Sequence, residues 1–270
     1  PADAAEIAQT LEVLGEVERR RGELESAERH YLESLAIRER RGDPDGIVSA
    51  LSSLAALRYS RRDYAGAETL YRRTLENELA ARGEAHPATA LQRMNLGMAL
   101  RRQGEVAEAI DQLRRALGVQ RAVYGPEHFT PTWTQVELAM GYQQQGELEL
   151  AAAELEAAYP RLVSKLGSDD ARTADVGVGF GQLRVRQGRA AEGEPILRQA
   201  LATLTERYGA GHYRLGAASL WLGRALAAEG RRSEAAAIWR AGLAGMRPGI
   251  DAKLIGQLER ELENAADGSA

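Results

Sequence analysis

The stretch Gly83-Glu-Ala-His86 is one copy of a short pattern, Gly-x-x-His or Gly-x-x-Asp, that recurs along the chain. The other copies are Gly42-Asp-Pro-Asp45, Gly125-Pro-Glu-His128, Gly167-Ser-Asp-Asp170 and Gly209-Ala-Gly-His212. Successive copies begin 41, 42, 42 and 42 residues apart. A fixed period in this range is typical of stacked supersecondary units, which bind through a continuous surface rather than in an enclosed cleft. The sequence therefore predicts a repeat protein.

The composition excludes several classes of function. The 270 residues carry 35 basic and 39 acidic side chains, a net charge of −4, which argues against the basic surface that nucleic-acid backbones require. Without cysteine there is no disulfide, thiolate metal site or thiol nucleophile. The apolar stretches fall far short of the roughly 20 residues that span a bilayer. The chain opens at Pro1 in a helical pattern without a signal peptide, and we interpret it as an excised, cytoplasmic segment.

Alignment of the chain with itself gives six units, each predicted to be a pair of helices joined by a turn. The turn residues are Gly22, Arg62, Gly104, Gly146, Gly188 and Gly230. Eight residues before each one, a large apolar residue is followed by a small one: Leu14-Gly15, Leu54-Ala55, Leu96-Gly97, Leu138-Ala139, Phe180-Gly181 and Leu222-Gly223. A small side chain at this point of the first helix is expected to let the second helix approach closely.

The second helix of each unit has a matching pattern. Five residues after the turn comes a small residue, Ala27, Ala67, Ala109, Ala151, Gly193 or Ala235, and four residues later a bulky one, Tyr31, Tyr71, Leu113, Leu155, Leu197 or Trp239. A spacing of four places these residues on one face of a helix, as an amphipathic helix packed on its neighbours requires.

This combination resembles the tetratricopeptide repeat, and the long period with its Gly-x-x-His segment resembles the kinesin-light-chain type of that repeat, over about residues 3 to 246. The resemblance implies an all-α, right-handed superhelical solenoid of six helix pairs. Its units are expected at about 3–41, 44–82, 86–124, 128–166, 170–208 and 212–247, within one array over residues 1–249.

Residues 250–270 are expected to hold a capping helix and a short disordered tail. Leu254, Ile255, Leu258 and Leu262 lie at helical spacing within a helix predicted over 251–264. Because a terminal repeat leaves an apolar face open, this helix is placed to cover it. The tail is expected to begin at Ala266.

The histidines of the recurring pattern are interpreted as turn and cap residues. His86, His128 and His212 each belong to a different junction between units, so they cannot converge on one metal. Pro87 follows His86, and Pro131 follows Thr130, in the arrangement of a cap residue before a proline in the first helical turn. The chain has no phosphate loop, HExxH or Gly-x-Ser-x-Gly motif. We expect no catalytic residue, metal or cofactor.

The fifth unit carries three glycines in its first helix, in the run Gly177-Val-Gly-Phe-Gly181. Each costs roughly 1 kcal/mol relative to alanine in a helix. The unit is therefore either packed unusually tightly or soft enough to bend, and the sequence favours softness.

In tetratricopeptide arrays the first helices line a concave groove, so the resemblance implies a partner-binding site there. In the third and fourth units the residues concerned are Leu91, Met94, Met98, Arg101, Arg102, Trp133, Val136, Met140 and Gln143. Methionine re-packs readily around varied partners. The groove is expected to take an apolar or amphipathic segment, with Arg101 and Arg102 reaching acidic groups beside it. Alternatively, adjacent first helices pack together and bury these residues as core.

The leading functional hypothesis is a non-enzymatic module that binds a partner protein or peptide, with no nucleic-acid or membrane partner. By resemblance to bacterial arrays it would be the scaffold or sensor part of a larger signalling protein. No lysine precedes Lys165, so the clamp that some family members use for a peptide carboxylate is not expected. The alternatives are a self-associating, homo-oligomeric scaffold, or an enzyme or small-ligand receptor around Asp175, Gln182 and Arg186.

Overall fold

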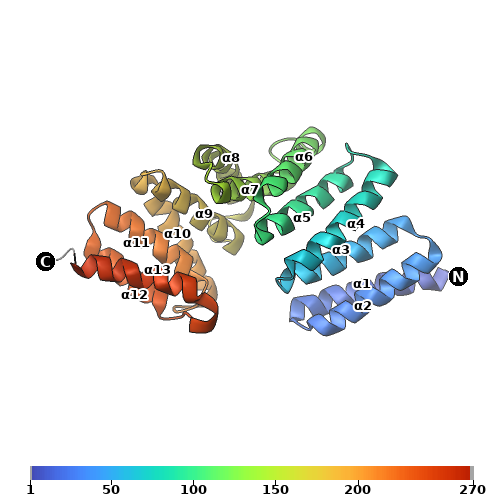
Figure 1. The fold of residues 1–270 in the computed structure, drawn as a ribbon, viewed down its shortest axis with the longest axis horizontal. Coiled ribbons are helices and arrows are strands. Elements are labelled where there is room, and N and C mark those ends of the chain that lie inside the picture. The colour runs from blue at the N-terminus through green and yellow to red at the C-terminus, as the bar shows by residue number, and fades with distance from the viewer. Residues whose placement is uncertain (1, 268–270) are drawn as a thin grey trace. The chain divides into compact units, whose positions relative to one another are not determined.

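The computed structural model describes residues 2–267, which form thirteen α-helices and contain no β-strand. The helices are α1 (Ala2–Arg21), α2 (Leu24–Arg41), α3 (Pro44–Ser60), α4 (Tyr64–Arg82), α5 (Pro87–Gln103), α6 (Val106–Tyr124), α7 (Phe129–Gln145), α8 (Leu148–Leu166), α9 (Ala171–Arg186), α10 (Ala190–Tyr208), α11 (Leu215–Ala228), α12 (Arg232–Leu243) and α13 (Pro248–Asp267). They form six pairs followed by one further helix (Figure 1). The predicted all-α class, with six helix pairs and a capping helix, is confirmed.

The chain divides into two compact units inside α7, Pro1–Gly141 and Tyr142–Ala270. In the first unit each helix from α1 to α6 packs on the next, and in the second unit the helices from α8 to α13 do the same. Within a unit, the first helices of neighbouring pairs also contact each other: α1 contacts α3, and α9 contacts α11. The six repeat boundaries predicted from the sequence stay a prediction.

The small residue of the first helix lies against the bulky residue of the second. A β-carbon on Gly15 would stand 2.6 Å from Tyr31 Cε1, and one on Gly97 would stand 2.7 Å from Leu113 Cγ. Real β-carbons essentially never come so close to another atom, so only glycine permits these approaches. The pattern of a small residue facing a bulky one is the steric contact that closes each pair.

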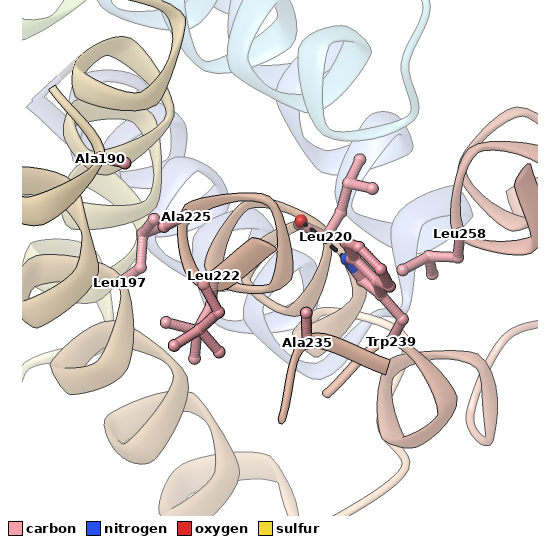
Figure 2. Close-up of a cluster of buried hydrophobic side chains, with 9 residues drawn as sticks. Ala190, Leu197, Leu220, Leu222, Ala225, Ala235, Trp239 and Leu258 are labelled. Carbon is pink, nitrogen blue, oxygen red and sulfur yellow. Dashed lines mark hydrogen bonds between the residues drawn. The ribbon is translucent and has the colours of Figure 1, made fainter. Parts of the chain in front are cut away.

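The second unit ends in a buried cluster around Trp239 of α12, shown in Figure 2. The indole is 2% exposed, and its Nε1 donates a hydrogen bond of 3.1 Å to the Leu220 carbonyl oxygen of α11. Leu258 of α13 is fully buried in the same cluster. Helix α13 thus covers the apolar face that the last pair would otherwise leave open.

The C-terminal end of α13 differs from the prediction. Ala266 and Asp267, expected in a disordered tail, belong to the helix. Alanine is the best helix former, so the run Ala265-Ala266 extends the last turn. Residues 268–270 of the predicted tail lie outside the described part of the chain.

The junctions between pairs require glycine. Gly83, Gly125, Gly167 and Gly209 have φ between 78° and 93° with ψ between 156° and 180° in magnitude, a region that other residues essentially never adopt. This requirement explains why the Gly-x-x-His pattern repeats. The first copy differs: Gly42 is left-handed with ψ 40°, and α3 begins at Pro44 behind the cap residue Asp43.

Two histidines of the pattern cap the helices that follow them. Nδ1 of His86 accepts a hydrogen bond of 3.2 Å from the Ala88 backbone N–H, and His128 accepts the equivalent bond from Thr130. His212 accepts a bond from the Arg214 backbone N–H within the turn before α11, whose N-cap position is occupied by Arg214. The His128 and His212 rings stack on the tyrosines four residues earlier, with centroids 4.9 Å apart in both cases.

The prolines lie in the first turns of their helices, but one predicted cap is replaced. Pro87 is the first residue of α5, and Pro131 is buried at the third position of α7. Thr130, expected to be the cap before Pro131, is already inside α7. His128 caps this helix instead, because its imidazole reaches the free N–H of Thr130.

The glycines of the fifth pair are closely packed. A β-carbon on Gly177 would stand 3.1 Å from the Tyr159 hydroxyl oxygen, and one on Gly193 would stand 2.9 Å from the Gly181 carbonyl oxygen. Gly181 itself lies beneath Leu197. Of the two alternatives left open by the sequence, tight packing therefore describes α9 and α10 better than the softness that the sequence favoured.

Candidate partner-binding face

The predicted partner-binding residues of the first unit lie on two neighbouring first helices. We call them the first-helix face: Leu91, Met94, Met98 and Arg101 of α5, and Trp133, Val136 and Met140 of α7. The spacings of three and four residues place each set along one side of its helix. Arg102 of α5 and Gln143, which belongs to the second unit, complete the predicted site.

Four apolar side chains of the first-helix face remain accessible. Leu91 is 41% exposed, and Met98, Trp133 and Met140 are half-buried. The Trp133 ring stacks on Phe129, one turn earlier on α7, with centroids 6.2 Å apart. Large apolar groups left open on adjacent helices are what a contact surface for an apolar segment requires.

Two members of the predicted site are core residues instead. Val136 is fully buried and Met94 nearly so. Adjacent first helices come close enough for direct side-chain bonds, such as the one of 3.3 Å from the Ser52 hydroxyl of α3 to the Gln92 amide oxygen of α5. At this separation the deepest side chains are enclosed between helices. For these two positions, the core alternative in the sequence analysis is the one that holds.

The sequence predicted that Arg101 reaches outward to acidic groups of a partner, but its side chain is turned to a neighbouring helix instead. Its guanidinium binds Glu137 of α7 at 2.7 Å, and both side chains are more than 90% buried. Sequence reasoning missed Glu137 as a partner because the two residues are 36 positions apart. The pair joins α5 to α7 beneath the accessible side chains.

Arg102 is exposed but already engaged with a neighbouring helix. Its Nε donates a hydrogen bond of 3.2 Å to the Tyr59 hydroxyl of α3. The remaining guanidinium nitrogens are the cationic groups that this part of α5 offers at the surface.

Gln143 has an internal partner in the second unit. Its amide nitrogen donates a hydrogen bond of 2.8 Å to the Gly179 carbonyl oxygen of α9. A glycine at that point brings the α9 backbone within reach. This contact gives Gln143 a role in holding α9 to the end of α7.

Helix α1 carries a shallow hollow that the sequence analysis did not single out. Gln9, Glu12, Val13, Glu16, Val17 and Arg20 line it, and its volume is about 420 Å³. Hydrogen bonding by Arg19, and then by Arg20, holds the pKa of Glu16 at about 2, against the opposing effect of burial. The exposed Val13 and Val17 beside these charges make the hollow amphipathic.

The described residues give no support to a metal centre or a membrane span. Across residues 2–267, no three histidine or carboxylate side chains lie where they could share a metal ion. Among the same residues, none of the helices combines the length and hydropathy needed to cross a bilayer.

Helix pairs that repeat at a fixed period, each closed by a small residue under a bulky one, define a helical repeat protein. The family model of the tetratricopeptide repeat matches residues 6–78 and 87–162, more than half of the chain. The chain belongs to the tetratricopeptide repeat family, whose fold is a scaffold for binding proteins or peptides. The comparison with curated proteins gave no match.

Solved structures of similar fold include repeats of the kinesin-light-chain type. BtubC (BKLC) from P. vanneervenii is 23% identical, with a TM-score of 0.67 over 83% of this chain and 94% of its own. A kinesin-light-chain-like protein from Podosopora anserina with nearly identical TPR-like repeats is 21% identical, with a TM-score of 0.59 over 79% of this chain and 94% of its own. The fold is similar to that of this type of repeat.

A longer array matches as well. A chain of the APC/C hetero-tetramer Cut9–Hcn1 is 17% identical, with a TM-score of 0.73 over 96% of this chain and 42% of its own. At these identities the likeness concerns the fold alone.

Proposed function

We propose that the chain is a non-enzymatic interaction module that binds an apolar or amphipathic segment of a partner protein on the first-helix face. The observation that carries this proposal is the set of accessible apolar side chains Leu91, Met98, Trp133 and Met140 on α5 and α7. Three of them are methionine or tryptophan, which offer large contact areas to an incoming chain.

The buried contacts beneath this surface support the proposal. The Arg101–Glu137 ion pair joins α5 to α7, and Met94 of α5 and Val136 of α7 are buried. The accessible side chains therefore sit on a rigid base, which lowers the entropy lost on binding. Arg102 offers a cationic group on α5 for an acidic residue of the partner.

The setting of the module is part of the same proposal. We place it in the cytoplasm of a bacterium, as the scaffold or sensor part of a larger signalling protein. The similarity to kinesin-light-chain-type repeats supports the scaffold role through the fold.

The test is affinity capture from a lysate of the source cells, with wild type compared to a Met98→Glu, Trp133→Ala double variant. Both positions are partly accessible, so the variant is expected to keep its helical circular dichroism. Leu150→Glu, at an exposed leucine of α8, is the matched control for a new surface charge. Wild type and control should enrich a protein that the double variant loses.

A second measurement locates the contact without weakening it. A photo-crosslinking amino acid at position 98 should form an adduct with the captured protein, and one at position 150 should not. Equal capture by all three chains, with no adduct from position 98, would show that the first-helix face is not the binding surface.

A further inference from the structure

The two helices that carry the first-helix face each begin behind a histidine. Nδ1 of His86 accepts a hydrogen bond of 3.2 Å from the Ala88 backbone N–H at the start of α5. Nδ1 of His128 accepts a bond of 3.2 Å from the Thr130 backbone N–H at the start of α7. Each bond satisfies one of the N–H groups that a helix leaves free in its first turn. The proposed binding surface therefore lies on helices whose caps are imidazoles.

Three other described helices have aspartate as their side-chain cap. The residues are Asp43 at α3, Asp63 at α4 and Asp170 at α9. A hydrogen bond from the Gly46 N–H lowers the pKa of Asp43, and one from the Arg172 side chain holds the pKa of Asp170 at about 2. An ordinary aspartate carboxylate is also ionised above about pH 5. The two kinds of cap thus differ in their response to mild acid.

Protonation removes the acceptor from a histidine cap. A neutral imidazole has one nitrogen that accepts a hydrogen bond, but a protonated imidazole donates from both nitrogens and accepts at neither. Its positive charge also lies at the N-terminal end of a helix, where the helix dipole disfavours cations. Histidine side chains change charge between about pH 8 and pH 5. In mild acid, α5 and α7 therefore lose a cap bond that α3, α4 and α9 keep.

The histidine caps lie close to two apolar side chains of the binding surface. Leu91 follows His86 by five residues, and Trp133 follows His128 by five residues. Each is the fifth residue of its helix, one turn beyond the cap. The two accessible methionines of the face lie seven residues further along the same helices. Fraying of the first turn therefore displaces Leu91 and Trp133 and leaves the methionines in place.

The charged groups around His86 are paired with one another. Arg82 and Glu84 are the charged residues nearest to His86 in the sequence. Arg82 binds Glu78 of α4 and Asp45 of α3, and Glu84 binds Arg93 of α5. A protonated His86 finds no free carboxylate among these groups to compensate for the lost cap bond.

The surroundings of His128 differ from those of His86. The His128 ring stacks on Tyr124 of α6, with centroids 4.9 Å apart. Because an aromatic face attracts a cation, the Tyr124 ring offsets part of the cap bond that protonation removes. Glu127 and Arg121, the nearest charged residues in the sequence, are opposite in sign. We expect His86 to contribute the larger part of the response to acid.

We propose that pH regulates the first-helix face: the module binds its partner at neutral pH and releases it in mild acid, when His86 and His128 no longer cap α5 and α7. This inference rests on the function proposed above and names the regulation of the same site.

The other two of the four histidines lie away from this surface. His30 of α2 binds Glu18 of α1 at 2.7 Å, a contact that protonation strengthens. His212 accepts its bond in the turn before α11, in the second unit. Substitution at positions 86 and 128 therefore separates the proposed effect from the titration of these two side chains.

The first measurement needs no partner. Amide hydrogen exchange at about pH 7.5 and pH 5.5, corrected for the intrinsic rate, reports the opening of the first turns. The amides of residues 90–93 and 132–135 are the first to bond within α5 and α7. Their protection should fall about fivefold at the lower pH, because one cap bond is lost from each helix. The equivalent amides of α9, residues 174–177, should show no change.

A double variant supplies the matched control. Asparagine is a strong cap whose amide does not titrate, so His86→Asn with His128→Asn should fold and should show equal protection at both pH values. His86→Asn alone should remove more of the pH dependence than His128→Asn alone.

The second measurement uses the protein captured through a photo-crosslinking amino acid at position 98. For wild type and for His212→Asn, the yield of adduct should be about fivefold lower at pH 5.5 than at pH 7.5. The double variant should give equal yields at both pH values. Since all three chains meet the same partner, titration of the partner itself cannot produce this difference.

The outcomes distinguish the two proposals. No adduct at either pH overturns the proposed function, and its regulation with it. An adduct of equal yield at both pH values, or a loss in acid that the double variant retains, overturns the regulation alone. Protection of α5 and α7 that does not change with pH also overturns it.

Discussion

The indole of Trp239 lies on the α-carbon of Gly223, so that α11 and α12 touch at a point where a single added methyl group has no room. The ring cannot move aside easily, because it is buried and its Nε1 is bonded to the Leu220 carbonyl oxygen at 3.1 Å (Figure 2). The same contact, with other bulky residues, closes the pairs at Gly15, Gly97 and Gly181. It is the steric basis of the repeat.

Gly223→Ala should therefore destabilise the chain, by about 2 kcal/mol, although alanine gains about 1 kcal/mol in helix propensity. Gly118→Ala is the control with the opposite sign, because Gly118 lies in α6 with open space around it, and it should stabilise by about 1 kcal/mol. Urea unfolding followed by circular dichroism measures both. Stabilisation by both substitutions would show that the Trp239 side chain can move to make room for the added methyl group.

Arg62 occupies the turn position that is glycine in the other five pairs, and it has the left-handed φ of 63°. For a residue with a β-carbon this conformation costs about 1 to 2 kcal/mol. Arg62→Gly should stabilise by about 0.5 kcal/mol, since relief of strain outweighs the greater flexibility of glycine in the unfolded chain.

The reverse change is the control for Arg62→Gly. Gly104→Ala, at φ 99°, should destabilise by about 1 kcal/mol. Thermal denaturation of both variants against wild type is the measurement. A lower melting temperature for Arg62→Gly would mean that the arginine side chain contributes more than the backbone strain costs.

The buried ion pair of Arg101 and Glu137 gives a prediction about coupling. Replacing either partner alone leaves a buried charge unpaired, so Arg101→Met and Glu137→Leu should each cost about 3 kcal/mol. The double variant should cost no more than either single one. A double-mutant cycle in urea measures this, and additive losses would show that the two side chains act independently.

The contact between the small and the bulky residue of each helix pair could be predicted from the sequence, because both residues lie close together along the chain in one helical hairpin. Gly97 and Leu113 lie 16 positions apart, on the two arms of one hairpin, and their sizes must match wherever the hairpin forms. The Gly-x-x-His turns are local as well. A period repeated six times leaves little freedom in assigning these elements.

The character of the first-helix face could not be predicted in the same way. Whether Met94 and Val136 are open depends on how closely neighbouring first helices approach, and no single repeat encodes that distance. Residues such as Arg101 and Glu137 meet across 36 positions without any spacing rule. The exposure of Leu14 could not be predicted either: Leu14 and Leu54 have the same place in the repeat pattern, but Leu54 is 3% exposed and Leu14 is 45% exposed.

Asp170, the N-cap residue of α9, makes the stability of the folded chain depend on pH in the acidic range. A hydrogen bond from the Arg172 side chain, helped by the Arg172 backbone N–H, holds the pKa of Asp170 at about 2 in the folded chain, below its ordinary value of 3.8. A folded pKa that is depressed contributes stability above the ordinary pKa, and this contribution is lost as pH falls towards 2. The contribution of the Asp170 carboxylate to the free energy of unfolding of the wild type should therefore be lost between about pH 4 and pH 2.

Asp170→Asn keeps an acceptor for the helix cap but removes the titration. At pH 6 it should melt about 2 °C below wild type, and the gap should close as the pH approaches 2. Asp169→Asn, one residue earlier, is the control for loss of a surface charge. A gap that stays constant from pH 6 to pH 2 would show that the carboxylate charge of Asp170 does not stabilise the fold.

Leu14 and Leu54 hold the same place in successive pairs, and their substitution measures directly whether the side of α1 that carries Leu14 is open. Leu54→Ala should cost about 2 to 5 kcal/mol, because the deleted atoms leave a cavity between α2 and α3. Leu14→Ala should change stability by no more than about 0.5 kcal/mol, since its side chain already lies in solvent. Urea unfolding at several protein concentrations gives both values. A large loss at Leu14 that grows with concentration would mean that copies of the chain cover this side of α1 in solution.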